Sequence, residues 1–270
     1  MVGLVLLLAF IFGAVIGSFL NVFIFRYNTG KNVGGRSKCL HCGATLSWRE
    51  LIPLVSFIVQ GGRCRSCGAA ISRQYPIVEF ITGIVFLAVA YKELIVPVGG
   101  LVQSFQFSSY ILYSLFYILA FCLLIAITAY DIRHKIIPNG PVWALTFISL
   151  VKVFTPLAFG STFLYSDILA GPFLALPFAL IWILSGGRAM GLGDAKLALG
   201  LGWMLGLSNG VSALLLSFWI GGAVGVYLLL RHRTRFTMKS ELPFAPFLAL
   251  SAFLAFLFNF DFFGLTNFFS

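Results

Sequence analysis

Residues 2–25 read VGLVLLLAFIFGAVIGSFLNVFIF, a stretch of 24 residues that contains no charged side chain. At about 1.5 Å of rise per residue, a helix of this length crosses a hydrocarbon layer roughly 30 Å thick. The stretch is too long for the core of a secretory signal peptide, and it lacks a basic leader and a small-residue cleavage site. We therefore interpret it as a retained first membrane-spanning helix.

The rest of the chain has the composition of a membrane protein. Of its 270 residues, 60% are hydrophobic and only 10% are charged, whereas soluble domains average about half and about a quarter. We expect an all-α polytopic membrane protein with about eight transmembrane helices. The spacing of Gly13 and Gly17 is typical of helices that approach each other closely. The seven further apolar segments span about 76–92, 108–130, 141–158, 167–186, 194–208, 209–230 and 244–263.

The basic residues predict the orientation of these helices, because Lys and Arg stay on the cytoplasmic side. With eight helices and Met1 outside, 16 of the 18 basic residues fall in four inner loops. The net charge of +10 therefore reflects topology, and it favours contact with anionic lipid of the bilayer. We find no nucleic-acid motif, and we interpret Arg231–Arg235 as part of an inner loop. The four loops are 26–75, 131–140, 187–196 and 231–243.

Only the segment 26–75 resembles a soluble domain, and it holds four of the five cysteines. They form two C-x2-C motifs, CLHCG and CRSCG, separated by 21 residues. Two such turns place four thiolates around one centre, the tetrahedral geometry that zinc prefers. Because so small a segment buries little apolar surface, a structural metal would stabilise it. The predicted zinc ligands are Cys39, Cys42, Cys64 and Cys67.

Two other interpretations of the cysteines stay open. Two disulfides are possible, although thiols stay reduced in the cytoplasm. A pair of redox C-x2-C sites is also possible, although no βαβ pattern surrounds the motifs. With the zinc interpretation, the chain divides into a first helix (1–25), a cytoplasmic zinc-knuckle domain (26–75) and a membrane domain (76–270), which carries the acidic site described next.

Residues 191–200, GLGDAKLALG, place Asp194 between a glycine-rich turn and an apolar run. Only eight residues of the chain are acidic, and an ionisable group at membrane depth is a functional candidate by default. The predicted topology puts Asp194 at the cytoplasmic start of the sixth helix. It puts Asp131, in TAYDIRHKIIPNG, at the cytoplasmic end of the third. The two carboxylates therefore lie at the same depth.

Two adjacent carboxylates share a proton, so that one acts as a base on water and the other as an acid toward a peptide carbonyl. Because the positive end of a helix favours an anion, we hypothesise that Asp194 is the base and Asp131 the acid. Gly191 and Gly193 would allow close approach of an extended substrate. The alternative is structural: Asp194 caps a helix and balances Lys196, and Asp131 pairs with a neighbouring basic residue.

These features together resemble the prepilin peptidases, which are GxGD-type membrane aspartyl proteases also called type IV leader peptidases. The resemblance extends from Gly17 to about Leu250. It is carried by the paired C-x2-C loop, the eight-helix count and five short segments. They are GSFLNVFIFR (17–26), RQYPIVEFITG (73–83), AYD (129–131) followed by IPN (137–139), GLGDAK (191–196) and ELPFAPFLA (241–249).

The resemblance implies a multi-pass protein of the bacterial inner membrane that cleaves the leader of type IV prepilins or pseudopilins at the cytoplasmic face. It also implies methylation of the new N-terminus with S-adenosylmethionine. Asp131 and Asp194 match the catalytic aspartates, and the four cysteines match the zinc tetrad. No glycine-rich loop shows where the cofactor binds. Glu79 is a candidate for contacting a substrate or cofactor amine, or a structural partner of Arg73 or Arg26.

Two other functions are weighed against this one. A presenilin-like or signal-peptide-peptidase-like intramembrane protease shares the AYD and GLGD signals, but the PAL motif is absent and the cysteine loop has no counterpart there. A proton-coupled transporter or a membrane assembly factor would also hold buried acids. In a transporter, however, these acids usually lie near the bilayer midplane.

Overall fold

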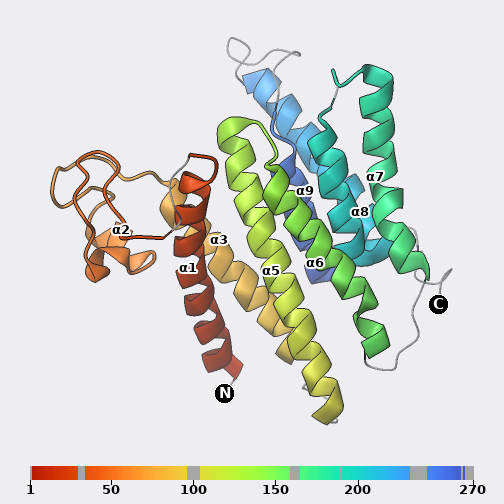
Figure 1. Cartoon of the computed structure of the whole chain (residues 1–270), viewed down its shortest axis with the longest axis horizontal. Coiled ribbons are helices and arrows are strands. Elements are labelled where there is room, and N and C mark those ends of the chain that lie inside the picture. Colours follow the sequence, from red (N-terminus) through yellow and green to blue (C-terminus); the bar gives the residue numbers. More distant parts are fainter. Residues whose placement is uncertain are drawn as a thin grey trace. The chain divides into compact units, whose positions relative to one another are not determined.

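The computed structural model describes residues 2–29, 34–95, 104–158, 165–188, 190–231, 242–262 and 264 (Figure 1). The chain forms two compact units, Met1–Ser114 and Leu115–Ser270. Among the described residues, six helices are long and apolar enough to cross a membrane, and no strand is formed. The expected all-α membrane architecture is therefore confirmed. The division into 1–25, 26–75 and 76–270 stays a prediction.

The first unit is built on the packing of α1 (Val2–Arg26) against α3 (Gln74–Val89). Glycines make this contact close: a Cβ on Gly13 would lie 2.7 Å from the Cβ of Phe86, and one on Gly17 would lie 2.8 Å from the Cα of Glu79. The interpretation of the Gly13 and Gly17 spacing as a helix-packing feature is thus confirmed. The last turn of α3 widens into a π-helix, η2 (Ala90–Ile95).

The loop between α1 and α3 carries the four cysteines. It includes a single 3-10 turn, η1 (Trp48–Leu51), and a short helix, α2 (Val55–Val59). The only β-type pairing within the described residues consists of two isolated bridges, Lys38 with Thr45 and Arg63 with Ala70. Local turns hold the backbone of this loop, but Cys64 is the only buried residue among those described in it. The loop therefore depends on some source of order other than an apolar core.

The second unit contains most of α5 (Ser104–His134), α6 (Asn139–Ala158), α7 (Tyr165–Ser185), α8 (Leu192–Arg231) and α9 (Ala245–Phe258). Helix α8 packs against α6, α7 and α9 and is therefore its central element. The final helix ends at Phe258, whereas the predicted segment extends to residue 263. Residue 263 lies outside the described residues, and so do five charged residues of the predicted inner loops: Lys31, Arg233, Arg235, Lys239 and Glu241.

Helix α8 reverses direction at Gly206 (Figure 1). Its 40 residues would extend about 60 Å as one helix, twice the thickness of a hydrocarbon core. Gly206 adopts φ 77° and ψ 179°, a region that is essentially restricted to glycine. The first arm reaches the start of α7, where the Trp203 Nε1–H donates to the Ile168 carbonyl at 2.8 Å. The second arm returns along α7, with Phe218 stacked on Phe178. The predicted boundary between segments 194–208 and 209–230 lies just after this reversal at Gly206.

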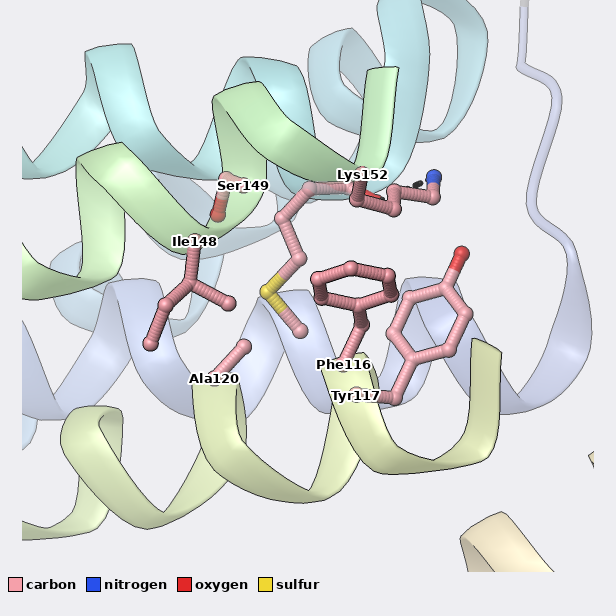
Figure 2. A pocket seen from close by; sticks show the side chains of 7 residues that line it. Phe116, Tyr117, Ala120, Ile148, Ser149 and Lys152 are labelled. Carbon is pink, nitrogen blue, oxygen red and sulfur yellow. Dashed lines mark hydrogen bonds between the residues drawn. The ribbon is translucent and has the colours of Figure 1, made fainter. Parts of the chain in front are cut away.

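Lys152 binds the end of the first arm (Figure 2). Its Nζ donates to the Met204 carbonyl at 2.8 Å and lies 5.2 Å from the centre of the Tyr117 ring. Beside it is a cavity of about 10 Å³, room for about one water molecule. The cavity is too small for a peptide, so its role is in packing. It is lined by Phe116, Tyr117, Ala120, Ile148, Ser149, Lys152 and Met204.

We predict that Gly206→Ala lowers the stability of the protein by about 1–3 kcal/mol, because a Cβ opposes this backbone conformation. The midpoint of thermal unfolding in detergent measures the effect. Gly222→Ala is the matched control, since Gly222 lies in the second arm of α8 with no atom within 4 Å of an added Cβ. It should be neutral or stabilising by about 0.5–1 kcal/mol. Equal midpoints for the two variants would contradict the assigned role of Gly206.

Candidate active site and cysteine cluster

Asp131 lies in the last turn of α5 and is 4% exposed. The helix ends just after it, where Lys135 takes a left-handed conformation (φ 54°) and donates its N–H to the Asp131 carbonyl at 2.7 Å. The Asp131 carboxylate accepts a hydrogen bond from the backbone N–H of Ala245 at 3.3 Å. Ala245 is the first residue of α9, so its N–H is one of those that a helix leaves without an internal partner.

Asp194 lies in the first turn of α8 and is 8% exposed. Its own N–H closes the preceding turn onto the Gly191 carbonyl at 3.2 Å. The turn packs tightly against the connection between α5 and α6: a Cβ on Gly193 would lie 2.9 Å from the Cβ of Ile137. Glycine at position 193 therefore allows the start of α8 to approach the residues that follow Asp131.

Lys196 forms a second link between these elements. Its Nζ donates to the Asn139 Oδ1 at 3.1 Å and lies 5.7 Å from the centre of the Trp143 ring. Both partners belong to the first turns of α6. In the structural alternative Asp194 balances the charge of Lys196, but the hydrogen bond of Lys196 goes to Asn139 and ties the start of α8 to α6.

The structure brings Asp131 and Asp194 together although 62 residues separate them in the sequence. The charge of the Asp131 carboxylate acts on Asp194, and both residues are buried. Both acids belong to one compact unit, and their predicted common depth in the membrane stays a prediction. A pair of buried carboxylates at helix ends can bind and activate a water molecule between them.

The N-terminus of α9 is the part of this site that sequence reasoning missed. The segment ELPFAPFLA was recognised as typical of the family, but nothing in it identifies the Ala245 N–H as a donor to Asp131. This contact also affects the acid–base hypothesis. Asp131 touches the negative end of α5 and the positive end of α9 at once. The positive end of α9 therefore opposes the negative end of α5 at Asp131, and the roles of Asp194 as base and Asp131 as acid stay a hypothesis.

The four predicted zinc ligands form one cluster. The sulfur atoms of Cys39, Cys42, Cys64 and Cys67 all lie within 4.8 Å of one another, and all four are free thiols. Sulfurs that bind one zinc ion at about 2.3 Å lie roughly 3.8 Å apart, close to the 4.0 Å between Cys39 and Cys67. This donor set fits a tetrahedral, thiolate-bound metal.

The two halves of the cluster are nearly identical turns. In the first, the backbone N–H of Cys39 donates to the Ala44 carbonyl at 2.9 Å, and the backbone N–H of Gly43 donates to the Cys39 carbonyl at 3.0 Å. In the second, the backbone N–H of Cys64 donates to the Ala69 carbonyl and that of Gly68 donates to the Cys64 carbonyl, both at 2.9 Å. Gly43 and Gly68 have φ angles of 73° and 70°, which favour glycine. Each C-x2-C-G motif thus folds the same way around the centre.

The environment of the sulfurs also suits a metal. The N–H groups of Cys42 and His41 point at the Cys39 sulfur and lower its pKa to about 6, which favours the thiolate form that binds metals. At Cys67, the hydrogen bond from the Ala69 N–H lowers the pKa of the thiol. Desolvation and the three neighbouring thiols have a larger opposite effect and raise this pKa to about 11. Four thiolates are therefore unfavourable here unless a cation neutralises them.

Among the described residues, Glu79 binds the cysteine loop instead of Arg73 or Arg26. It is 6% exposed within α3, and its Oε2 accepts the backbone N–H of Leu54 at 2.8 Å. The Ser18 hydroxyl of α1 is its other hydrogen-bonding neighbour. This buried acid thus joins the loop to both helices of the first unit.

Comparison with known proteins assigns these two regions to two parts of one protein family. Residues 11–93 match the bacterial peptidase A24 N-terminal domain, and residues 118–226 match the type IV leader peptidase family. The chain is 31% identical to the prepilin leader peptidase/N-methyltransferase of Bacillus subtilis, with 93% of each chain covered. It is also 31% identical to the protein of that name from Aeromonas hydrophila, with 93% and 89% covered. No solved structure matches.

The two matched regions and the membrane-spanning helices define a polytopic membrane peptidase. At this identity over nearly its whole length, the chain belongs to the type IV leader peptidase family, whose relatives bear the name prepilin leader peptidase/N-methyltransferase. The expected family is thereby confirmed. Neither the presenilin-like protease nor the transporter or assembly factor is favoured by these matches.

We predict that Gly193→Ala reduces the rate of substrate cleavage, because the added methyl group displaces the turn that carries Asp194 from Ile137. The double variant with Ile137→Ala should recover part of the loss, since it removes the atom that the methyl group meets. Cleavage rates of the four proteins in this double-mutant cycle measure the coupling between the two positions. Strictly additive effects would show that the Gly193–Ile137 contact does not position Asp194.

Proposed function

We propose that this protein is a membrane aspartyl endopeptidase that removes the leader peptide of type IV prepilins or pseudopilins and then methylates the new N-terminus. The observation that carries the proposal is the buried carboxylate pair, Asp131 and Asp194, at adjoining ends of α5 and α8. Membership of the family supports it.

The carboxylate pair supplies both the base and the acid of peptide hydrolysis. One ionised aspartate takes a proton from a water molecule, whose oxygen attacks the scissile carbonyl carbon. The other aspartate, which is protonated, donates to the carbonyl oxygen. The tetrahedral intermediate collapses when the C–N bond breaks and the amine takes up a proton. The Ala245 N–H, the Gly193–Ile137 contact and the Lys196–Asn139 hydrogen bond hold the two acids for this exchange.

The charge pattern supports cleavage at the cytoplasmic face of the bacterial inner membrane. A prepilin inserts with its basic leader inside by the same positive-inside rule that orients this chain. Its scissile bond then lies near the end of its membrane helix, at the depth where α5 ends and α8 begins. The cysteine loop belongs to the same side, because segment 26–75 has eight basic residues and one acidic residue.

The cysteine cluster supports a structural role for zinc. Cys39, Cys42, Cys64 and Cys67 would hold the ion in a closed four-sulfur site, which has no position left for a substrate. The bound metal would order a loop that has little core of its own. S-adenosylmethionine would supply an electrophilic methyl group for the new amino terminus.

We predict that Asp131→Asn and Asp194→Asn each lower prepilin cleavage about a hundredfold or more, because each removes a proton donor or acceptor. The rate of leader release from a prepilin reconstituted with the enzyme in lipid measures the effect. Asp167→Asn is the control, since Asp167 is an acid of the same unit that lies beside Gly206 at the opposite end of the first arm. It should cleave at nearly the normal rate. Activity retained in either site variant would refute the assignment of the carboxylate pair.

We also predict that loss of the metal lowers methylation more than cleavage. Cys39→Ser, or treatment with a strong chelator, weakens the loop of the first unit but leaves the Asp131–Asp194 pair of the second unit in place. Mass spectrometry of the processed prepilin N-terminus reports both the cleavage point and the added methyl group. Cys122→Ala, which alters the one cysteine outside the cluster, should preserve both activities. An equal loss of both activities in Cys39→Ser would contradict separable sites.

A further inference from the structure

The cysteine loop exposes an unusual number of large apolar side chains. Within residues 48–59, the side chains of Trp48, Ile58 and Val59 are 71%, 76% and 67% exposed. Leu51, Ile52 and Val55 are also exposed. A loop of so little core would bury such residues if it could, and contiguous exposed apolar surface marks an interaction site. We define this segment, Trp48–Val59, as the apolar segment.

Glu79 fixes the position of the apolar segment relative to α3. The Leu54 N–H in the middle of the segment donates to the Glu79 Oε2 at 2.8 Å. Glu79 lies within α3, one helical turn beyond Tyr75, and α3 is a membrane-spanning helix. The centre of the segment is therefore held beside the first two turns of α3 rather than out in the cytosol.

Aromatic side chains place the membrane boundary at the same level. Phe25, near the end of α1, stacks on Tyr75, near the start of α3, with ring centres 4.9 Å apart. Arg26 and Tyr27 follow directly in the sequence. Aromatic and basic residues at helix ends are typical of the headgroup level. Because the Glu79 side chain that holds Leu54 starts one turn from Tyr75 and leans toward the start of the helix, the middle of the apolar segment is held close to this level.

A distinctive turn presents α2 at this depth. Leu54 has φ 61° and ψ −51°, a conformation rarely adopted by a bulky residue. The Val55 N–H donates to the Pro53 carbonyl at 2.6 Å, which closes a tight three-residue turn of the rare type. Such backbone strain persists only where the surroundings impose it. Here the Glu79 carboxylate holds the turn, and α2 begins immediately after it with Val55, Ile58 and Val59 exposed.

The charges around the apolar segment match an anionic lipid surface. The Arg49 guanidinium lies 5.3 Å from the centre of the Trp48 ring, and Arg63 and Arg65 are exposed nearby in the sequence. The one acidic residue of the loop, Glu50, is occupied by hydrogen bonds from the Ser47 backbone and hydroxyl, both 2.8 Å. The Ser47 backbone and hydroxyl keep the pKa of Glu50 below its ordinary value, so Glu50 stays ionised, and the charge of Arg65 offsets its own. An apolar face flanked by Arg is the pattern of a helix that lies in the membrane interface.

We propose that the apolar segment is a membrane-surface anchor, which inserts its exposed side chains among the headgroups and upper acyl chains of the anionic leaflet where α1 ends. The anchor keeps the cysteine cluster close to the bilayer surface. Because both ends of the loop enter membrane-spanning helices, lipid is the surface that the segment meets first. A substrate helix, a second copy of the chain or residues 115–270 are the other occupants that an experiment must distinguish.

The test is photo-crosslinking of the full-length protein in nanodiscs of phosphatidylethanolamine and phosphatidylglycerol. p-Benzoylphenylalanine is introduced singly at Ile58, Val59, Leu4 and Thr45. Leu4 is the positive control, since it is 61% exposed within the apolar α1. Thr45 is the matched negative control, since it is exposed in the same loop outside the apolar segment. Mass spectrometry after irradiation identifies what each probe has captured.

We expect phospholipid adducts at Ile58 and Val59 at a yield comparable to Leu4 and several-fold above Thr45. Replacing phosphatidylglycerol by phosphatidylcholine should lower the yield at Ile58 and Val59 but not at Leu4. The proposal is overturned if Ile58 and Val59 give no more lipid adduct than Thr45. It is also overturned if their main products are peptides of residues 115–270, a crosslinked dimer or a co-reconstituted prepilin.

Discussion

The close contact between the start of α8 and the turn after α5 is the constraint on which the proposed active site depends. Gly193 lies against Ile137, and a Cβ there would be 2.9 Å from a neighbouring carbon atom. This contact brings two acids that are distant in sequence within range of each other's charge. Since hydrocarbon offers no hydrogen bonds to an ionised group, such a pair is tolerable only where helix ends and backbone N–H groups surround it. The N-terminus of α9 supplies one such group.

The reversal of α8 at Gly206 also helps to position Asp194, because it sets where the arm that carries this residue ends. Because the chain turns back at Gly206, the arm that carries Asp194 is much shorter than a full membrane crossing. Its far end is held by Lys152 and Trp203 through hydrogen bonds to backbone carbonyls. Both ends of the arm are thus fixed by polar contacts, while α6, α7 and the second arm of α8 supply its apolar surroundings.

In the first unit, a polar loop is ordered although it has almost no apolar core of its own. Two copies of one turn, each with a glycine of positive φ, gather four sulfurs. A buried acid of α3 then ties the loop to the membrane helices through a single backbone N–H. The metal-binding thiols and Glu79 act on different parts of the loop, and the apolar segment lies between the two cysteine pairs. The two units match separate parts of the family, which agrees with two chemical activities in one chain.

The sequence by itself determined the membrane-spanning helices, because apolar composition and segment length reflect the solvent around each residue directly. It also determined the cysteine cluster, since C-x2-C spacing constrains two ligands locally, and it singled out Asp131 and Asp194 as acids where lipid meets water. Only the tertiary structure decided the donation from Ala245 to Asp131, the Gly193–Ile137 contact and the link from Glu79 to Leu54. These interactions join residues that are distant in the chain and depend on the angles at which whole helices pack. No local pattern of residue types encodes such angles.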